Sequence, residues 1–266
     1  KKTLKDVDVV IHLACISNDP SFELNPKLGR SINYEAFEPL VGLSRNAGVK
    51  RFVYASSSSV YGVKTEENVF EDMKLEPLTD YSLFKAKCEE ILNQYTSDNF
   101  TTVILRPATV CGFSRRQRLD VVVNILTNLA YHKKVITVLG GNQLRPNIHV
   151  DDMVHAYSEI IKAKPNTING EAFNVGYENI SVDNLARQVK DLIGGDVKIV
   201  YKASSDNRSY HISSRKIEQT IGFSPRKTVE DAIVDLKKAF DEKILQRPLD
   251  NEFYFNIKRM KSVDLE

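Results

Sequence analysis

The sequence has few cysteines, and neither cysteine nor histidine occurs at a metal-binding spacing. Its 266 residues include three cysteines, Cys15, Cys88 and Cys111, which lie far apart and form no CxxC pair. A disulfide framework or a zinc site is therefore not expected, and reduced thiols in the core of a cytoplasmic protein are the simplest interpretation. The five histidines show no HExxH or similar spacing, so the sequence predicts no metal site.

Long apolar runs and a strong net charge are also lacking. No run approaches the roughly 20 residues that a membrane-spanning helix needs, and the first residues have neither the apolar core nor the cleavage site of a signal peptide. The formal net charge of +2 gives no reason to expect nucleic acid or an acidic membrane as a partner. With 42% hydrophobic and 27% charged residues, the composition is that of a soluble globular protein.

A glycine-rich nucleotide-binding turn is absent as well. No GxGxxG or GxxGxxG occurs, and the first glycine, Gly29, lies in a helical pattern. A complete dinucleotide-binding fold opens with a strand and such a turn, which lets the backbone approach a pyrophosphate. In that fold this chain would lack the first βαβαβ unit, about 60 residues at roughly 30 per βαβ unit. We therefore expect the chain to be a fragment of a longer enzyme. The alternative is that the family's active site is retained without the glycine-rich turn that binds the pyrophosphate of the cofactor.

What is present is an alternation of apolar strands and helices over the first 112 residues. Such an order predicts right-handed crossovers and a parallel sheet, so we predict an α/β fold with a Rossmann-like, doubly wound sheet. Thr79 or Asp80 is a candidate cap for the second helix. Strands are expected at 7–15, 49–57 and 100–108, and helices at 25–48 and 80–98.

Beyond residue 112 helices and short strands are mixed, which predicts a smaller α+β substrate domain. We assign 1–112, with contributions from about 135–180, to the dinucleotide-binding domain, and 113–266 mainly to the substrate domain and a tail. The tail, 247–266, is expected to be irregular or to wrap around the rest of the molecule. Further helices are expected at 119–134, 151–164, 182–195, 213–223 and 228–244, and strands at 135–150, 170–176 and 196–201.

Tyr81 and Lys85 form a candidate proton-relay pair. At positions i and i+4 of a predicted helix, both side chains lie on one face. Free tyrosine has a pKa near 10, about three units too high for a base at neutral pH, but a nearby ammonium and a cationic nicotinamide favour the tyrosinate. The spacing alone is a weak signal, and Tyr254–Lys258 repeats it in the tail. Tyr81 is preferred because a serine-rich strand end precedes it.

Eight stretches along the chain carry a family resemblance: "DVVIHLA" (8–14), "NPKLGRSINYEA" (25–36), "RFVYASSSSVYG" (51–62), "YSLFK" (81–85), "LRPATVCG" (105–112), "RPNIHVDDM" (145–153), "EAFNVG" (171–176) and "DNRSYHISSRKIEQTIGFSP" (206–225). With these stretches the chain resembles the extended short-chain dehydrogenase/reductases of the nucleotide-sugar epimerase/dehydratase family. The stretches follow the family's order over nearly the whole chain.

The resemblance implies roles for individual residues. Ser57 takes the place of the catalytic Ser or Thr, Tyr81 is the base, and Lys85 tunes it and holds the ribose of the cofactor. Thr109 and Cys111 replace residues common in relatives, so the sugar pocket differs. The implied cofactor-binding residues are Leu13, Ala14, Asn33, Ala55, Ser56, Tyr81, Lys85 and Ala108, and the implied substrate-binding residues are Ser57, Ser58, Thr109, Arg118, Asn124, Arg145 and Arg208.

The residues after Ser57 narrow the implied chemistry. Family dehydratases, uronic-acid decarboxylases and C3/C5 epimerases place a carboxylate or a thiol there, whereas this chain has Ser58 and Ser59. A serine hydroxyl is too weak an acid or base to replace those groups at neutral pH. Hydride transfer at C4 of the sugar therefore remains, as 4-epimerisation or as net oxidation or reduction.

The expected function is thus that of an NAD(P)-dependent nucleotide-sugar 4-epimerase or C4 oxidoreductase. NAD is the expected cofactor; NADP stays open, because the deciding residue would lie in the missing half. A non-catalytic family member that binds sugar nucleotides or a partner protein is the alternative, while an RNA-associated relative fits the charge poorly. Relatives commonly form homodimers through the two helices expected here at 25–48 and 80–98, so a homodimer is expected.

Overall fold

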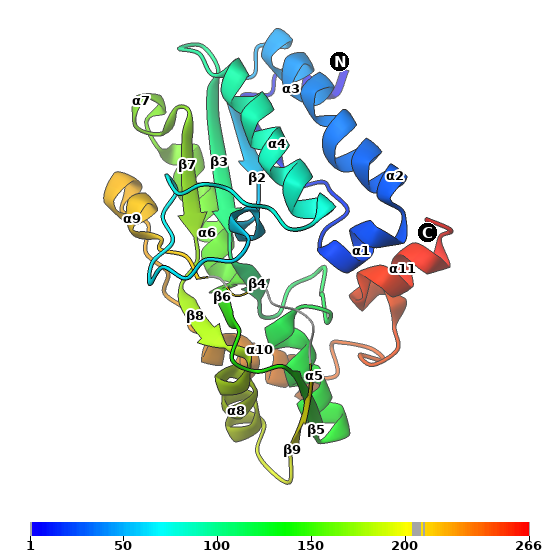
Figure 1. The fold of residues 1–266 in the computed structure, drawn as a ribbon. Helices are drawn as coiled ribbons and strands as arrows, with labels where there is room; N and C mark the ends of the chain where they lie inside the picture. The colour runs from blue at the N-terminus through cyan, green and yellow to red at the C-terminus, as the bar shows by residue number, and fades with distance from the viewer. Residues whose placement is uncertain (1, 204–208, 210, 266) are drawn as a thin grey trace.

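A four-stranded parallel sheet forms the centre of the larger half of the molecule (Figure 1). The computed structural model describes residues 2–203, 209 and 211–265. Every neighbouring pair in the sheet is parallel, which confirms the predicted α/β fold. The strands stand in the order β1 (Val9–His12), β2 (Arg51–Ala55), β3 (Thr101–Pro107) and β7 (Glu171–Val175).

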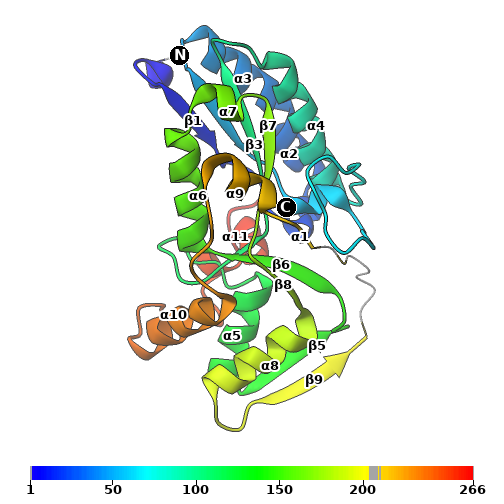
Figure 2. The ribbon, with the colours of Figure 1, turned by 90° about the vertical axis from the view of Figure 1, so that its left-hand side faces the viewer.

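Alternate strand residues point to opposite faces of the sheet, and helices cover both (Figure 2). Phe52 and Tyr54 of β2 pack under α3 (Phe37–Asn46) and α4 (Asp80–Tyr95). Val53, between them, faces the other side. There the sheet is covered by α6 (Val150–Lys162), α7 (Pro165–Ile168) and α9 (Arg215–Ile221).

The helix expected at 25–48 forms over 26–46, with a π-helical turn within it. Asn25 caps its start, because its side chain accepts a hydrogen bond from the backbone N–H of Leu28 at 3.0 Å, and Pro26 follows it. The helix consists of α2 (Pro26–Arg30), the π turn η2 (Ser31–Glu35) and α3. The short helix α1 (Asp19–Leu24) precedes it.

A second core lies below the parallel sheet in Figure 1. A three-stranded sheet has the order β4 (Thr109–Cys111), β6 (Leu144–His149) and β8 (Glu178–Ser181). A parallel pair joins β5 (Val135–Leu139) and β9 (Lys198–Lys202), and both pack with α5 (Val122–Lys133), α8 (Val182–Ile193) and α10 (Val229–Asp241). The domain boundary near residue 112 stays a prediction.

The tail was expected to be irregular or wrapping; it forms the turn η4 (Glu252–Tyr254) and the helix α11 (Asn256–Ser262), which packs against α1. Asn251 caps η4 by accepting a hydrogen bond from the backbone of Phe253. Figure 1 shows α11 beside α1, at the edge of the molecule. No helix in the described ranges is long and apolar enough to cross a membrane. The remaining short elements are η1 (Lys2–Leu4) and η3 (Ser58–Tyr61).

Candidate active site

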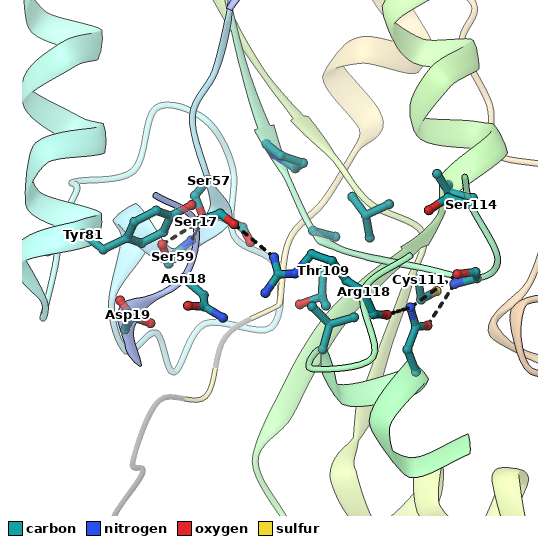
Figure 3. Close-up of a pocket in the computed structure, with 18 of the residues that line it drawn as sticks. Ser17, Asn18, Asp19, Ser57, Ser59, Tyr81, Thr109, Cys111, Ser114 and Arg118 are labelled. Atoms are coloured by element: carbon teal, nitrogen blue, oxygen red, sulfur yellow. Dashed lines mark hydrogen bonds between the residues drawn. The ribbon is translucent and has the colours of Figure 1, made fainter. Parts of the chain in front are cut away.

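A cavity of about 350 Å³ lies at the carboxyl ends of β2 and β3 (Figure 3). Open α/β sheets bind their ligands at this edge, where loops leave the strands. The loop after β1 also reaches the cavity, as does the segment that links β4 to α5. The walls are formed mainly by residues 17–19, 56–59 and 107–112, together with Tyr81 and Arg118.

Ser57 and Tyr81 meet at one wall of this cavity. Ser57 follows β2 in an extended conformation (φ −160°) and caps η3, and its hydroxyl lies 2.8 Å from that of Ser59. Tyr81 is the second residue of α4, whose start is fixed by a capping box at Thr79. The Ser57 and Tyr81 side chains both line the cavity, and Figure 3 shows them close together at this wall. The sequence prediction that brings these two residues into one site therefore agrees with the geometry.

The surroundings of Tyr81 raise its pKa well above the ordinary value for tyrosine. Burial is the main cause, and the neighbouring Cys15 and Asp19 act in the same direction. The charge of Arg118 and the hydrogen bond from Ser57 act in the opposite direction and lower it. At neutral pH Tyr81 is therefore a protonated phenol in this form of the protein, and additional positive charge is needed to make it a base.

Lys85 lies one turn further along α4 and is buried. Its ammonium donates to the carbonyl of Ala55 at 2.6 Å, and it lies 5.0 Å from the ring centroid of Tyr54 and 5.8 Å from that of Tyr81. An ammonium has three donors, and within the described ranges Ala55 is the hydrogen-bond acceptor for this one. Burial and the charge of Lys85 lower the pKa of His12, at the end of β1, to about 4. His12 is therefore neutral at neutral pH.

A buried polar network lies behind the serines. Ser56 directs its hydroxyl to Glu89 rather than toward the cavity. Glu89 forms an ion pair of 2.7 Å with Arg106, which also donates to Tyr61 at 2.7 Å. Tyr61 in turn donates to Asn174 at 2.7 Å. Sequence reasoning missed this network, although Glu89 follows Lys85 by one helical turn on the same face of α4.

Arg118 extends along the opposite side of the cavity. Its Nε donates to Asp120 at 2.8 Å and its Nη1 donates to Ser17 at 3.2 Å. Its Nη2 is buried without a hydrogen-bond partner among the residues described. Figure 3 shows the guanidinium between Tyr81 and Ser57 on one side and Thr109 on the other. An unpaired nitrogen of a charged group at such a place fits an acidic oxygen of a ligand.

Asn33 and Asn124 hold loops of the site in place. The amide of Asn33 accepts from the backbone N–H of Ile16 at 2.8 Å and donates to its carbonyl at 2.9 Å. Asn124 accepts from the backbone of Gly112 at 3.0 Å and donates to the carbonyl of Arg118 at 2.8 Å. A direct role in binding cofactor or substrate stays a prediction for both residues.

The other predicted residues are dispersed. Ser58 and Ala108 are buried in the cavity wall, and Leu13 and Ala14 are exposed after β1. Arg145, in β6, is absent from the cavity wall, and its Nη1 donates to the carbonyl of Leu144 at 3.0 Å. The remaining residue, Arg208, lies outside the described residues. Sequence reasoning did not single out 17–19, the loop after β1 that completes the cavity.

A histidine and two carboxylates gather beneath the loop that carries Arg118. His149, Asp151 and Asp235 bring ligand atoms within 4.8 Å of one another. The cation at this place is the ammonium of Lys227, 2.7 Å from Asp151 and 3.3 Å from Asp235. His149 accepts a hydrogen bond from the backbone of Asp151 through Nδ1, so its Nε2–H faces Asp235 at 3.1 Å. The cluster therefore has a structural explanation without a metal.

Comparisons with known proteins give matches over most of the chain. The sequence pattern of the NAD dependent epimerase/dehydratase family matches residues 1–176. The uncharacterised UDP-glucose epimerase YtcB of Bacillus subtilis is 30% identical over 240 residues, covering 87% of this chain and 74% of that protein. The UDP-glucose 4-epimerase of Lactobacillus helveticus is 25% identical over 257 residues, covering 87% and 77%.

Among solved structures, the UDP-glucuronic acid 4-epimerase of Bacillus cereus, in complex with UDP-glucuronic acid and NAD, superimposes with a TM-score of 0.81. The two sequences are 25% identical, and the match covers 91% of this chain and 78% of that one.

Proposed function

Since the chain belongs to the NAD dependent epimerase/dehydratase family of enzymes, we propose that it oxidises the C4 hydroxyl of a nucleotide-linked sugar, as a 4-epimerase or C4 oxidoreductase. The placement of Ser57 and Tyr81 side by side at the wall of the cavity (Figure 3) is the observation that carries this proposal. A hydroxyl placed between these two groups contacts a proton acceptor and a second polar anchor at once, which is the arrangement that general-base catalysis on an alcohol needs.

In the proposed reaction Tyr81, as phenolate, accepts the proton of the C4 hydroxyl. Ser57 holds the C4 oxygen by a hydrogen bond while the C–H bond at C4 breaks. NAD, the cofactor of the family, would be held beside Lys85 and would supply a reversible hydride acceptor for C4. Return of hydride to the same face of the sugar would regenerate the substrate, and return to the opposite face would give its epimer. Tyr81 returns the proton to the C4 oxygen in the second half of the reaction. Protons and electrons are thus conserved in epimerisation.

The residues around Lys85 suit a nicotinamide nucleotide. The buried ammonium has donors left for ribose hydroxyls, because Ala55 accepts from it and an ammonium carries three. Leu13, which follows β1 and is 56% exposed, offers apolar surface at the same edge of the sheet. A bound cationic ring would add to the charge of Arg118 in favouring the phenolate of Tyr81.

The cavity argues against dehydration and C3/C5 epimerisation. Both reactions need a second acid or base near C5, and Ser58 and Ser59 do not supply one. Cys111 lines the cavity, but burial raises its pKa to about 12, and its thiol donates to the carbonyl of Ile148. Asp19 accepts a hydrogen bond from Thr79 at the start of α4, which ties that carboxylate to the helix end.

Arg118 favours a sugar that carries an acidic group. Its Nη2 is buried and has no partner in the described part of the chain. The hydroxyls of Ser58, Ser59 and Thr109 line the same cavity and can donate to the second oxygen of a carboxylate. We therefore expect a nucleotide-linked hexuronic acid to be preferred over the corresponding hexose, in line with the UDP-glucuronic acid 4-epimerase that shares this fold.

A panel assay tests the proposal. The purified protein is incubated with NAD and with UDP-glucose or UDP-glucuronic acid, and the products are separated by chromatography. We expect 4-epimer or 4-keto product, faster from the acid, and loss of turnover by at least about a hundredfold in Tyr81→Phe with an unchanged melting temperature. Nucleotide-sugar binding without any product in the unmodified protein would instead favour a non-catalytic family member. Equal turnover in Tyr81→Phe would contradict the assigned base.

We also propose a cytoplasmic homodimer that packs α3 and α4 against their copies. Leu43, on α3, is 40% exposed and Ile32, just before it, is 38% exposed, which leaves apolar surface on this side of the sheet. Sedimentation measures the mass directly. A monomer at all accessible concentrations would contradict this part of the proposal.

A further inference from the structure

The C-terminal segment 251–262 is far from the cavity in sequence but contacts its outer wall. Asn256 begins α11, and that helix packs beside α1, which follows the site loop 17–19 (Figure 1). Arg116, two residues before Arg118, donates to the backbone carbonyl of Phe253 and to the side chain of Asn256. The tail thereby reaches the loop between β4 and α5. This loop carries Arg118, which forms the cationic wall of the cavity.

Asn256 contacts both groups that hold the Arg118 guanidinium. The carboxylate of Asp120 accepts from Arg118 Nε at 2.8 Å through Oδ1, and from the backbone N–H of Asn256 at 2.7 Å through Oδ2. The hydroxyl of Ser17 accepts from Arg118 Nη1 at 3.2 Å and from the Asn256 side-chain amide at 3.0 Å. That amide also lies 3.3 Å from the carbonyl oxygen of Ser17.

The geometry points to Asn256 as a positioning residue: it fixes the two anchors of Arg118, so that the third guanidinium nitrogen is directed to the substrate. This inference rests on the proposed function, in which Arg118 faces an acidic sugar. The physical reason is the long side chain of arginine, which loses much conformational freedom when it binds. When Asn256 holds Ser17 and Asp120 in place, the Arg118 side chain has less conformational freedom left to lose on binding. Asn256 therefore strengthens binding, although it does not contact the ligand.

Two substitutions at Asn256 separate the two contacts. Asn256→Ala removes the side-chain bonds to Ser17 and keeps the backbone bond to Asp120. Asn256→Pro removes both, and proline is well tolerated here because Asn256 is the first residue of α11. Phe255 before it has φ −130° and ψ 112°, the extended conformation that a following proline requires. Lys258→Ala, an exposed position on the same helix whose ammonium contacts the Leu249 carbonyl, is the matched control.

The measurement is the dissociation constant of UDP-glucuronic acid by calorimetry, with UDP-glucose as the uncharged comparison. We expect Asn256→Pro to weaken binding of the acid about tenfold, which is the range for a charge-assisted hydrogen bond. Asn256→Ala should weaken it less, and Lys258→Ala should leave it unchanged. The affinity for UDP-glucose should change much less than that for the acid.

A double-mutant cycle decides whether Asn256 acts through Arg118. In an Arg118→Ala background, Asn256→Pro should have no further effect on binding of the acid. Wild-type affinity in Asn256→Pro, or an equal loss in both backgrounds, would overturn the inference.

Crystal structures of the wild type and Asn256→Pro give a readout that is independent of activity. In the variant Arg118 should no longer contact Ser17 and Asp120, and an unmoved guanidinium would also overturn the inference. If the wild type neither binds nor converts nucleotide sugars, the proposed function fails, while these crystal structures still test the anchoring.

Discussion

Glu89 and Arg106 form a buried ion pair of 2.7 Å directly behind the serines that follow β2. Their side chains are 4% and 7% exposed. Glu89 also accepts a hydrogen bond from Ser56, the residue before Ser57. The backbone N–H of Ser56 donates to Leu105 at 2.8 Å, so the same residue is tied to β3. The start of the serine segment that follows β2 is thereby fixed from two directions.

Glu89→Ala should therefore destabilise the protein and also reduce turnover. Removal of one partner from a buried pair leaves the other charge uncompensated, which costs about 3–5 kcal/mol of unfolding free energy. Urea denaturation measures this loss. The double variant Glu89→Leu/Arg106→Leu should regain part of the stability, because it leaves no unpaired charge. A double variant less stable than Glu89→Ala would show that the rest of the network, with Tyr61, matters more than the pair.

Gly112→Ala should distort the loop that joins β4 to the cationic wall. Gly112 has φ +100°, which other residues rarely adopt, and a Cβ there would lie 2.9 Å from Nε2 of His149. His149 is hydrogen-bonded to Asp151 and Asp235, so its ring cannot easily move away from the added Cβ. We expect a loss of about 2–4 kcal/mol in unfolding free energy, together with weaker binding of nucleotide sugars.

Gly222→Ala is the control for backbone strain alone. Gly222 has φ +71°, and nothing lies within 4 Å of the Cβ that would be added. The strain of a positive φ costs about 1 kcal/mol, so the difference between the two variants measures the contact with His149. Equal losses would mean that the loop adapts without cost.

The sequence predicted the parallel sheet and the shared face of Tyr81 and Lys85 because both depend on local patterns, whereas Ser57 was assigned through the resemblance. Buried parallel strands are continuous apolar runs, and the residue spacing of one helix fixes which side chains share a face. The π-helical turn within the helix over 25–48 was missed, and its residue Asn33 contacts Ile16 in the loop after β1. Periodicity does not encode a contact with a distant loop.

The cationic wall was predicted only in part, for a related reason. Arg118 was singled out through the resemblance, but one of its anchors is Ser17, which Asn256 in the tail also contacts. These three residues are distant in sequence, and no pattern within one element links them. Asn256 lies in a segment that was expected to be irregular or to wrap around the molecule, so tertiary contacts decide its structure.

Arg118→Gln should shift the pH dependence of turnover to higher pH. Among the groups that face Tyr81, Cys15 and Asp19 raise its pKa, whereas the charge of Arg118 and the hydrogen bond from Ser57 lower it. Loss of the guanidinium charge therefore raises the pKa of Tyr81. The active phenolate then becomes less populated at any given pH below that pKa, and the rising limb of kcat moves toward alkaline pH, by about one unit.

The measurement uses saturating substrate, so that weaker binding does not contribute to the profile. Arg187→Gln is the matched control, because Arg187 is an exposed arginine on α8 that pairs with Asp183 at 2.9 Å. Its profile should coincide with that of the wild type. Ser57→Ala should move the limb in the same direction as Arg118→Gln, since the lost hydrogen bond also favours the phenolate. An unmoved limb in Arg118→Gln would mean that Arg118 serves binding alone and that Tyr81 depends on Lys85 and the cofactor for its ionisation.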